Sequence, residues 1–300
     1  MNRYINCIAH KSSEGNLLIG NDRTALVDCG MAFCAGGTIQ RVKDALKQRP
    51  LDYIILTHTH YDHIGALPFF INEWPELRTV TSATGAEVLL KATPRRVIRE
   101  LSLAAAEKYG AMTDTTFSGD VLLNTDVLHS DIIVKEGESV SLGGLTVEVF
   151  EAPGHTRDSI NFFIPELEML IGNETPGVLM PDGSVYPGYL SSYTDTINSI
   201  EKCRKIPFKQ LSLPHRGLVS SEDGKGYFDK ALSANIACRD FILGMKKKGL
   251  NEDEMQDSYY QHYCNETLLS FHPIEAFLVN TSARISTTLR EYEASLNTGL

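Results

Sequence analysis

The sequence lacks several features that would assign the protein to a specialised class. Its six cysteines include no CxxC pair, which argues against a zinc knuckle or a dithiol redox motif. No apolar run approaches the length needed to span a bilayer, and residues 1–5 do not begin a signal peptide. We therefore expect a cytoplasmic protein with no membrane partner, whose cysteines are reduced and buried.

Positive charge is also scarce. The formal net charge is −10, and the densest basic run is Lys246-Lys247-Lys248. Because nucleic-acid-binding proteins normally carry a basic patch, we expect no nucleic-acid partner. A Gly-x-Ser-x-Gly nucleophile elbow is absent as well, so the sequence does not indicate a serine hydrolase of that type.

Length and composition are otherwise those of an ordinary globular protein. The chain has 300 residues, of which 42% are hydrophobic and 22% are charged. Such a chain can bury a sizeable core without disulfides or structural metals. The length predicts one large domain, or a large domain with an appendage.

Strand-like runs alternate with helical patterns in the first two thirds of the chain, which favours an α/β fold. Apolar runs predict strands over 25–30 and 52–56, and the spacing of apolar residues predicts a helix over 38–48. A further helix is expected from Thr93, as the N-cap before a first-position proline, to Tyr109.

Hairpins are predicted in the middle of the chain. The Gly143-Gly144 step separates two strand-like runs, 139–142 and 145–149. A second pair of strands, 162–164 and 169–171, flanks a short turn.

After Gly224 the sequence pattern becomes typical of helices. A helix is predicted over 227–248, a second opens with a capping-box-like Asn251 and Glu254, and a third follows Pro273. We therefore predict three parts of the chain: a catalytic domain over 1–222, a lid or insert within it over 92–130, and an all-helical C-terminal segment over 223–300.

One short segment gathers most of the residues with metal-binding chemistry. His58, His60, Asp62 and His63 lie within six residues, directly after a predicted strand. Residues i and i+2 leaving a strand point to the same side, so His58 and His60 can reach one cation. Asp62 and His63 can then reach a second position, and Gly65 relieves crowding of the backbone. Imidazole and carboxylate ligands suit zinc and, nearly as well, iron.

Two further histidines also follow strand-like stretches. His155 lies in Pro-Gly-His-Thr, where Thr156 and Asp158 are candidates to orient its ring by hydrogen bonds. His215 lies in Pro-His-Arg-Gly, and the neighbouring Arg216 either grips an anionic group of a substrate or pairs with a surface carboxylate. Either motif taken alone is more typical of an ordinary turn than of a ligand.

Taken together, these motifs resemble the metallo-β-lactamase superfamily. The similarity covers roughly residues 14–220 and includes Thr-His-x-His-x-Asp-His-x-Gly from Thr57, Pro-Gly-His-Thr, Pro-His-x-Gly and an early strand that ends in Asp28-Cys29-Gly30. The resemblance implies an αββα sandwich with an all-helical C-terminal extension. Helical C-terminal segments that cover the site are found in the similar glyoxalase II group and in the quinolone-signal response thioesterase of pseudomonads.

The resemblance also implies a binuclear site with two divalent transition metal ions, zinc first, with iron or manganese as alternatives. A bridging carboxylate is an aspartate in most members, but this chain has Asn173-Glu174 there. Either residue can align with that position, and we expect Glu174 because it keeps the negative charge. Asp28 would hold a loop or a ligand histidine in place. The expected ligands are His58, His60 and His155 for one metal, Asp62, His63 and His215 for the other, and Glu174 between them.

These expectations predict a metal-dependent hydrolase. A hydroxide that bridges the two metals would attack a small ester, thioester or lactone, and Asp62 would orient it and shuttle a proton. Alternatives are a phosphodiester or sulfate ester hydrolase, a single-iron dioxygenase, and a signalling or ligand-binding protein with vestigial activity. The expected partner is a small-molecule substrate. The sequence leaves open whether the protein forms a homodimer.

Overall fold

The computed structural model describes residues 3–7, 10, 15–110, 119–124, 126–224 and 226–298. By their internal contacts, the residues form two compact units. The first unit comprises Met1–Glu151, Asp158–Asn173 and Pro207–Ser220. The second unit comprises Ala152–Arg157, Glu174–Ile206 and Ser221–Leu300. The predicted domain boundary near residue 222 stays a prediction, as does the lid, of which residues 111–118 and 125 lie outside the described part.

The first unit contains a mixed six-stranded sheet, here called sheet A. Its strands follow each other in sequence order, with antiparallel pairing up to β3 and parallel pairing from β3 to β6. β2 and β3 are buried along their whole length, as expected for strands covered on both faces. The strands of sheet A are β1 (Tyr4–Asn6), β2 (Asn16–Ile19), β3 (Thr24–Val27), β4 (Tyr53–Ile55), β5 (Arg78–Ser82) and β6 (Ile132–Val134).

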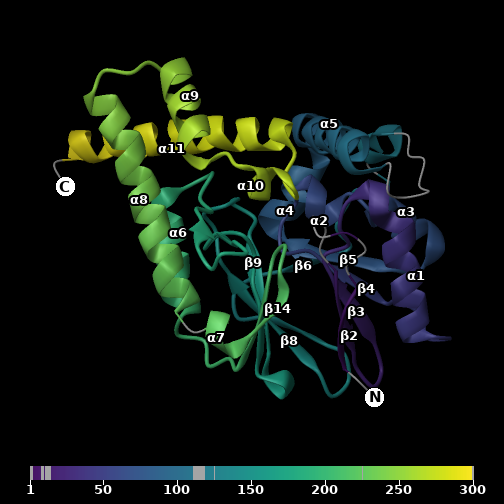
Figure 1. The fold of residues 1–300 in the computed structure, drawn as a ribbon. Helices are drawn as coiled ribbons and strands as arrows, with labels where there is room; N and C mark the ends of the chain where they lie inside the picture. The colour runs from purple at the N-terminus through teal and green to yellow at the C-terminus, as the bar shows by residue number, and fades with distance from the viewer. Residues whose placement is uncertain are drawn as a thin grey trace. The chain divides into compact units, whose positions relative to one another are not determined.

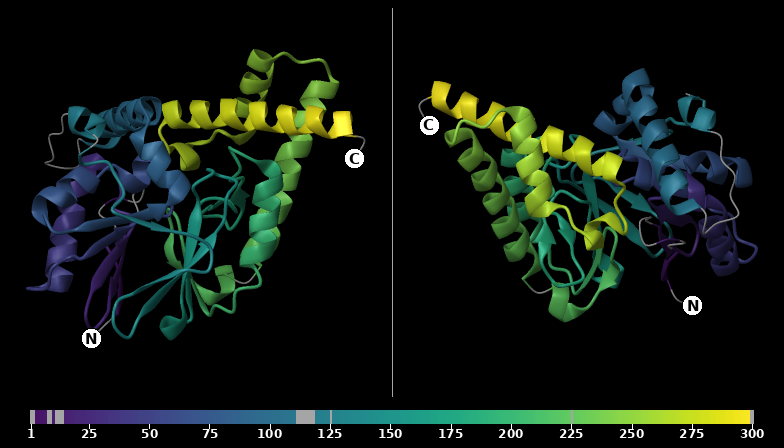
Figure 2. Two further views of the ribbon diagram at one scale, coloured as in Figure 1. Left: turned by 180° about the vertical axis from the view of Figure 1, so that it is seen from behind. Right: turned by 45° about the horizontal axis from the view of Figure 1, so that its top comes forward.

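Helices connect the parallel strands of sheet A. In Figures 1 and 2, α1 and α3 lie on the face of sheet A that points away from the other sheet of this unit. These helices are α1 (Ala35–Leu46), α2 (Tyr61–Ile64), α3 (Leu67–Glu73), α4 (Ala83–Leu90) and α5 (Ala92–Tyr109), with 3₁₀ turns η1 (Ala32–Cys34) and η3 (Gly119–Leu123). The predicted start of α5 was wrong: Lys91 precedes the helix and Thr93 lies inside its first turn, where Pro94 is tolerated because its missing N–H needs no partner.

The second six-stranded sheet of this unit, sheet B, has the order β14-β13-β10-β9-β8-β7. The hairpin predicted around Gly143-Gly144 is confirmed by the pairing of β7 with β8, and β9 pairs with β10 as predicted. Only β10 and β13 run parallel. The strands are β7 (Ser139–Ser141), β8 (Thr146–Glu151), β9 (Ile160–Ile164), β10 (Met169–Ile171), β13 (Gln210–Leu213) and β14 (Gly217–Val219), with a 3₁₀ turn η4 (Pro165–Leu167).

Apolar side chains from both sheets form one core in the first unit. Alternate residues of the strands point into it, so the two sheets pack face to face. Sheet A contributes Leu18, Ala25, Val27, Ile55, Val80 and Val134, and sheet B contributes Val147, Val149, Ile160, Phe162, Ile164, Met169 and Ile171. This sandwich holds the ends of β4 and β13 in fixed places, and the candidate ligands of this unit follow those ends.

The second unit is mainly helical. In Figure 1, α11, drawn in yellow, runs across α8 and α9. The helices predicted after Gly224 are confirmed, including the capping box in which Asn251 and Glu254 exchange hydrogen bonds; the short α10 was not predicted. The elements are β11 (Val178–Leu179), β12 (Val185–Tyr186), α6 (Tyr193–Cys203), α7 (Ser221–Gly224), α8 (Tyr227–Lys247), α9 (Glu252–Tyr263), α10 (Glu266–Leu269) and α11 (Ile274–Thr298).

The second unit has a core of its own. Apolar residues of α8, α9 and α11 pack with the segment after β12, which includes the fully buried Tyr189. Arg284 of α11 is also fully buried, among tyrosine rings. A strongly polar group thus lies inside an otherwise apolar core.

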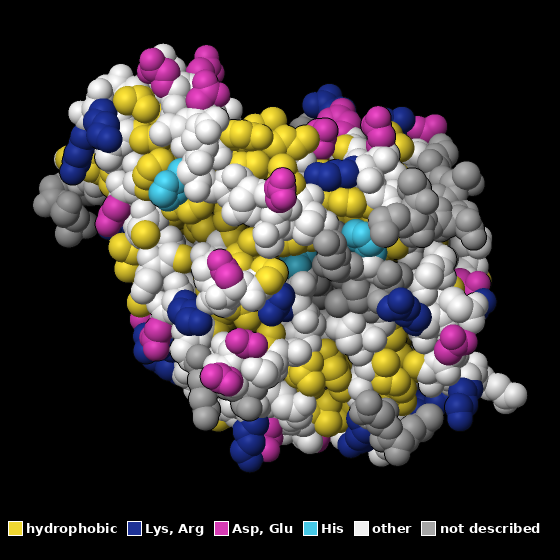
Figure 3. Space-filling view, in the orientation of Figure 1, with side chains coloured by type: hydrophobic (Ala, Val, Ile, Leu, Met, Phe, Trp, Pro, Cys, Tyr) yellow, Lys and Arg dark blue, Asp and Glu magenta, His cyan; other side chains and the backbone are white. Residues whose placement is uncertain are grey.

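The described residues also bear on the expectations drawn from cysteines and charge. None of the six cysteines, all within the described residues, forms a disulfide, and five of them are buried. In Figure 3, the Lys and Arg side chains drawn on the visible face are scattered. Within the described residues, no helix combines the length and apolarity that a bilayer crossing requires.

Candidate metal centre

The histidine-rich segment of the first unit leaves the carboxyl end of β4. β4 pairs in parallel with β3 and β5, so the chain emerges at the edge where parallel strands carry functional loops. His58 is 1% exposed, and its ring centroid lies 4.7 Å from that of His60 and 4.1 Å from that of His63. The single turn of α2 begins after His60. Three imidazoles therefore gather within one local segment.

Asp28 and Thr57 orient the rings of His58 and His63. The Asp28 carboxylate lies 2.8 Å from Nδ1 of His63 and accepts hydrogen bonds from both the N–H (2.8 Å) and the hydroxyl (2.7 Å) of Thr57. Since the Thr57 hydroxyl gives its proton to Asp28, its oxygen accepts from Nδ1 of His58 at 3.1 Å. Both rings thus carry their proton on Nδ1 and present Nε2 as the nitrogen able to bind a cation.

The turn after β3 fixes the other side of this segment. The N–H groups of Cys29 and Gly30 donate to the His63 carbonyl, and the Cys29 thiol lies 3.3 Å from the same oxygen. Burial raises the pKa of the Cys29 thiol well above its usual value, which fits its position as a donor to this carbonyl. A Cβ on Gly65 would collide with the carbonyl of Tyr61, which explains the glycine there.

Asp62 and His215 complete the candidate ligands of the first unit. The carboxylate of Asp62 is buried and lies 3.7 Å from Nε2 of His215 and 3.9 Å from Nε2 of His63. His215 has φ of 60° and Asp28 has φ of 58°, a region that non-glycine residues rarely adopt. Such conformations cost on the order of 1–3 kcal/mol and cluster at functional sites, which fits the placement of both residues here.

The second unit carries two candidate ligands, His155 and Glu174. Nε2 of His155 lies 2.8 Å from a carboxylate oxygen of Glu174, and both side chains are buried. Nδ1 of His155 lies 2.6 Å from the carbonyl oxygen of Gly188. Because a carbonyl can only accept, the proton lies on Nδ1, and Nε2 is again the nitrogen able to bind a cation. The N–H of His155 donates to the Thr175 hydroxyl, which in turn donates to the carbonyl of Ala152.

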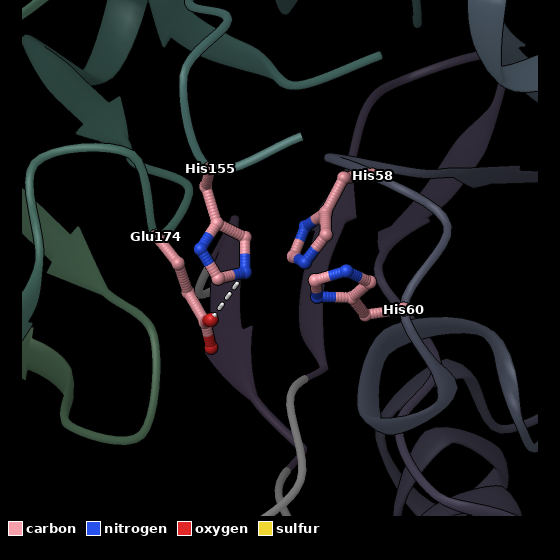
Figure 4. Close-up of side chains that lie close together, drawn as sticks. All are labelled: His58, His60, His155 and Glu174. Carbon is pink, nitrogen blue, oxygen red and sulfur yellow. Dashed lines mark ion pairs between the residues drawn. The ribbon is translucent and has the colours of Figure 1, made fainter. Parts of the chain in front are cut away.

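The ligand atoms fall into two groups, within each of which all atoms lie within 4.8 Å of one another. Figure 4 shows the first group, in which the dashed line marks the ion pair of His155 with Glu174. Glu174 is common to both groups. The groups are His58, His60, His155 and Glu174, and Asp62, His63, Glu174 and His215.

The chemistry of this donor set fits divalent transition metals. Imidazoles and carboxylates are the ligands that zinc, iron and manganese take, and three of the rings have their tautomer fixed by a second hydrogen bond. Buried carboxylates also need cationic partners to offset their loss of hydration. The seven residues named from the sequence are the members of these two groups, whereas their roles as ligands and that of Asp62 in catalysis stay predictions.

Three secondary expectations have different outcomes. Asp158 was expected to help orient the His155 ring, and this was wrong: the ring bonds to Gly188, and Asp158 accepts a bond from Ser82 through its backbone carbonyl. The N–H of Asn173, the alternative to Glu174, donates to the side chain of Asn161, and the choice between the two at the bridging position stays a prediction. Arg216 is exposed, and its role stays open.

Sequence reasoning expected Asp28 to hold a ligand histidine, which its contact with the His63 ring confirms, but it missed the other residues that hold the ligands. Thr57 was read only as part of a motif, although its hydroxyl joins Asp28 to the His58 ring. Gly188, Asn235 and Arg284 carry no motif, and their hydrogen bonds join segments far apart in sequence. Thr57 could have been found from its position between a strand and a ligand. No sequence pattern marks the other three residues.

Comparison with known proteins adds relatives of more than one activity. The metallo-beta-lactamase fold-containing protein ST1585 of Sulfurisphaera tokodaii is 24% identical over 225 residues, which cover 72% of this chain and 77% of that protein. Nitric oxide reductase of Moorella thermoacetica is 30% identical over 173 residues (56% of this chain, 35% of that one). Hydroxyacylglutathione hydrolase of Legionella pneumophila is 27% identical over 150 residues (50% and 42%). This chain thus spans less than half of the length of the last two.

Solved structures show the same fold at low sequence identity. The metallo-beta-lactamase family protein TTHA1429 of Thermus thermophilus has a TM-score of 0.58 at 17% identity, covering 98% of this chain and 95% of that one. The sec-alkylsulfatase Pisa1 of a Pseudomonas species has a TM-score of 0.63 at 11% identity, covering 96% and 49%.

The family model described as the metallo-beta-lactamase superfamily matches residues 16–215, which is more than half of the chain and includes every candidate ligand. The order of motifs, the two sheets with their connecting helices and the paired ligand groups agree with that match. This protein therefore belongs to the metallo-beta-lactamase superfamily and has its fold.

Proposed function

We propose that this protein is a binuclear metal-dependent hydrolase that acts on a small ester, thioester or lactone. The observation that carries the proposal is the place of Glu174, the one carboxylate common to both groups of ligand atoms. Two divalent cations repel each other strongly at short range, so a site for both needs anionic ligands. A shared glutamate meets that need where most members of the family have an aspartate.

Each cation would have three further ligands of its own. In this assignment His58, His60 and His155 hold one ion, while Asp62, His63 and His215 hold the other. When bound, such a pair of cations supplies an activated water nucleophile at neutral pH and a Lewis acid for the substrate oxygen. The chain itself keeps the rings in the tautomer that presents Nε2, through Asp28, Thr57 and the Gly188 carbonyl.

Asp62 is the residue that we assign to proton transfer. Its carboxylate is 4% exposed and lies near the Nε2 atoms of His63 and His215. Its carboxylate would help to hold one cation, and it would accept a proton from the attacking water and pass that proton to the leaving group. The ester class is supported by the scarcity of positive charge and by the relative named hydroxyacylglutathione hydrolase.

The proposal is tested by metal analysis together with a substrate panel. Purified protein, stripped with a chelator and reloaded with zinc, iron or manganese, is expected to bind two equivalents. On a panel that also contains sulfate esters and phosphodiesters, it should then hydrolyse at least one ester, thioester or lactone, whereas turnover of only the sulfate esters or phosphodiesters would contradict the proposed substrate class. His60→Ala should abolish turnover. A protein that binds no transition metal, or that turns over the panel equally well without it, would contradict the proposal.

The matched control is His129→Ala. His129 is partly exposed and pairs with Asp131 at 3.2 Å, and it belongs to neither ligand group. This variant should keep both metal equivalents and full turnover, which separates loss of a ligand from loss of any histidine.

A second candidate function is a signalling or ligand-binding role. The observation in its favour is the exchange of the usual bridging aspartate for Asn173-Glu174, which changes the site at one position. If the metal-loaded protein shows no turnover, and if chelation and His60→Ala leave its biological effect intact, the binding role is favoured over the hydrolase.

A further inference from the structure

The ring of His155 is supported by one segment of the second unit, residues 187–192, here called the support segment. Besides the bond from His155 Nδ1 to the Gly188 carbonyl, three successive N–H groups of this segment point at the carbonyl of Gly154, which precedes the histidine. Their distances to that oxygen are 3.1 Å from Leu190, 2.9 Å from Ser191 and 3.2 Å from Ser192. The support segment therefore holds both the backbone and the ring of this candidate ligand.

The same segment also packs against the other candidate ligand of this unit. A Cβ on Gly188 would collide with the carbonyl oxygens of Glu174 and Thr175, so the backbones approach more closely than any other residue allows. A shift of Gly188 would therefore displace both His155 and Glu174.

Asn235 of α8 ties the support segment to the loop after Glu174. Its side-chain oxygen accepts from the N–H groups of Gly188 (3.0 Å) and Tyr189 (3.4 Å), and its amide nitrogen donates to the carbonyl of Pro176 at 2.8 Å. A further bond to Ala231 within α8 fixes the side-chain rotamer. Asn235 is fully buried and uses both its acceptor and its donors, so an apolar replacement leaves several backbone groups without partners.

Arg284 of α11 holds the peptide units on either side of Gly188. Its Nη2 donates to the Pro187 carbonyl at 2.9 Å and its Nε to the Tyr189 carbonyl at 3.1 Å. The remaining nitrogen, Nη1, lies within 3.1–3.3 Å of the hydroxyls of Tyr259 and Tyr186. Arg284 is 1% exposed, and no carboxylate of the described residues pairs with it.

Burying a guanidinium without a carboxylate partner costs free energy, because the charge loses its hydration. An apolar side chain of similar volume would pack between α9 and α11 without the cost of burying a charge. What only the planar, forked guanidinium provides is two donors in fixed directions, and these donors reach the two carbonyls that flank Gly188.

We propose that Asn235 and Arg284 are positioning residues for the metal centre, through which the C-terminal helices α8 and α11 set the orientation of the His155 ring. This inference rests on the proposed function, because it concerns a ligand of the proposed centre. Outer partners of a ligand histidine fix its tautomer and direction, and their loss weakens metal binding by about 10–100-fold.

The test uses Asn235→Asp and Arg284→Met in the full chain. Asn235→Asp keeps the acceptor and removes the donor to Pro176, whereas Arg284→Met keeps much of the volume and removes both donors to the support segment. We expect each variant to lower the affinity for one zinc equivalent by about 10–100-fold, measured in competition with a chromophoric chelator. The visible spectrum of the cobalt-loaded protein should shift as well. Arg284→Lys, which restores the charge and one donor, should recover part of the affinity.

A second measurement does not depend on metal. In the chelator-treated wild type, the His155 Nδ1 proton should give a protected downfield NMR signal, identified by its absence in His155→Gln. The signal should broaden or vanish in the Asn235 and Arg284 variants. Thr281→Val is the matched control: Thr281 is buried in α11 one turn before Arg284, and no hydrogen bond joins it to the support segment.

The outcomes separate this inference from the proposed function. Variants that bind zinc as tightly as wild type and keep the His155 signal overturn the inference and leave the hydrolase proposal standing. A wild type that binds none of zinc, iron and manganese, but whose His155 signal is lost in the variants, overturns the proposed function while the support of the ring stands. A control Thr281→Val with the same loss would show a general effect of α11 and would overturn the specific role of Arg284.

Discussion

The two units place their candidate ligands by different means. In the first unit, His58, His60, Asp62 and His63 come from one strand end and one helical turn, and their nearest supports, Asp28 and Thr57, lie at the ends of neighbouring parallel strands. In the second unit, His155 and Glu174 lie in irregular segments, and side chains from helices later in the chain hold them. The first set of ligands is thus supported from neighbouring strand ends, whereas the second set depends on helices far away in the sequence.

The largest effect is expected from Asp62→Asn in the first unit. The change keeps the shape but removes the negative charge and the proton acceptor, so kcat should fall by about 10³-fold, as for loss of a general base. Steady-state kinetics on the best substrate of the panel, with metal content measured in parallel, checks this. Asp120→Asn, at an exposed carboxylate that pairs with Arg99, should leave kcat unchanged. Equal activity of Asp62→Asn and wild type would remove Asp62 from the mechanism.

A smaller effect is expected from Asp28→Asn, also in the first unit. Asn tolerates the positive φ of this position, so the backbone should not change, but the charged acceptor of the His63 ring is lost. We expect the affinity for one zinc equivalent to fall by about 10–100-fold. Chelator competition measures it, with the exposed Asp22→Asn as the control. Unchanged affinity would mean that the backbone alone orients His63.

In the second unit, Gly188→Ala should act mainly on stability. Because the new methyl group has no room beside the Glu174 carbonyl, we expect a loss of about 1–3 kcal/mol in the free energy of unfolding, typical of overpacking. Urea unfolding of the metal-free protein measures it. Gly244→Ala in α8, where a Cβ meets nothing, should instead stabilise the protein by about 0.5–1 kcal/mol. If both alanines behave alike, the close packing at Gly188 does not hold in solution.

The smallest effect is expected from Asn251→Ala at the start of α9. Loss of the capping box should cost about 1 kcal/mol of unfolding free energy, and Asn251→Asp should cost little. Zinc affinity should stay at the wild-type value in both, because no bond of Asn251 reaches the support segment. A change in zinc affinity here would show that the helices of the second unit act on the ligands as a whole and not through Asn235 and Arg284.

Much of the fold was predictable where the pattern is local. The β7–β8 hairpin follows from two alternating runs around Gly143-Gly144, and α9 follows from its capping box. The start of α5 was not, because the helix begins after Lys91 without a side-chain cap, so no capping residue marks its start in the sequence. The short β11 and β12 carry no periodicity, since two residues are too few to show one.

The sequence by itself determined the family and the set of candidate ligands. Four of the seven ligands lie within six residues, and the spacing of such a motif can be read directly from the sequence. Apart from Asp28, only the tertiary structure decided which groups hold the rings: Thr57 in the first unit, and the Gly188 carbonyl, Asn235 and Arg284 in the second. The physical reason is that a hydrogen bond to a backbone carbonyl asks for no particular side chain at the acceptor. Contacts of this kind leave no motif, and they become visible only when the chain is folded.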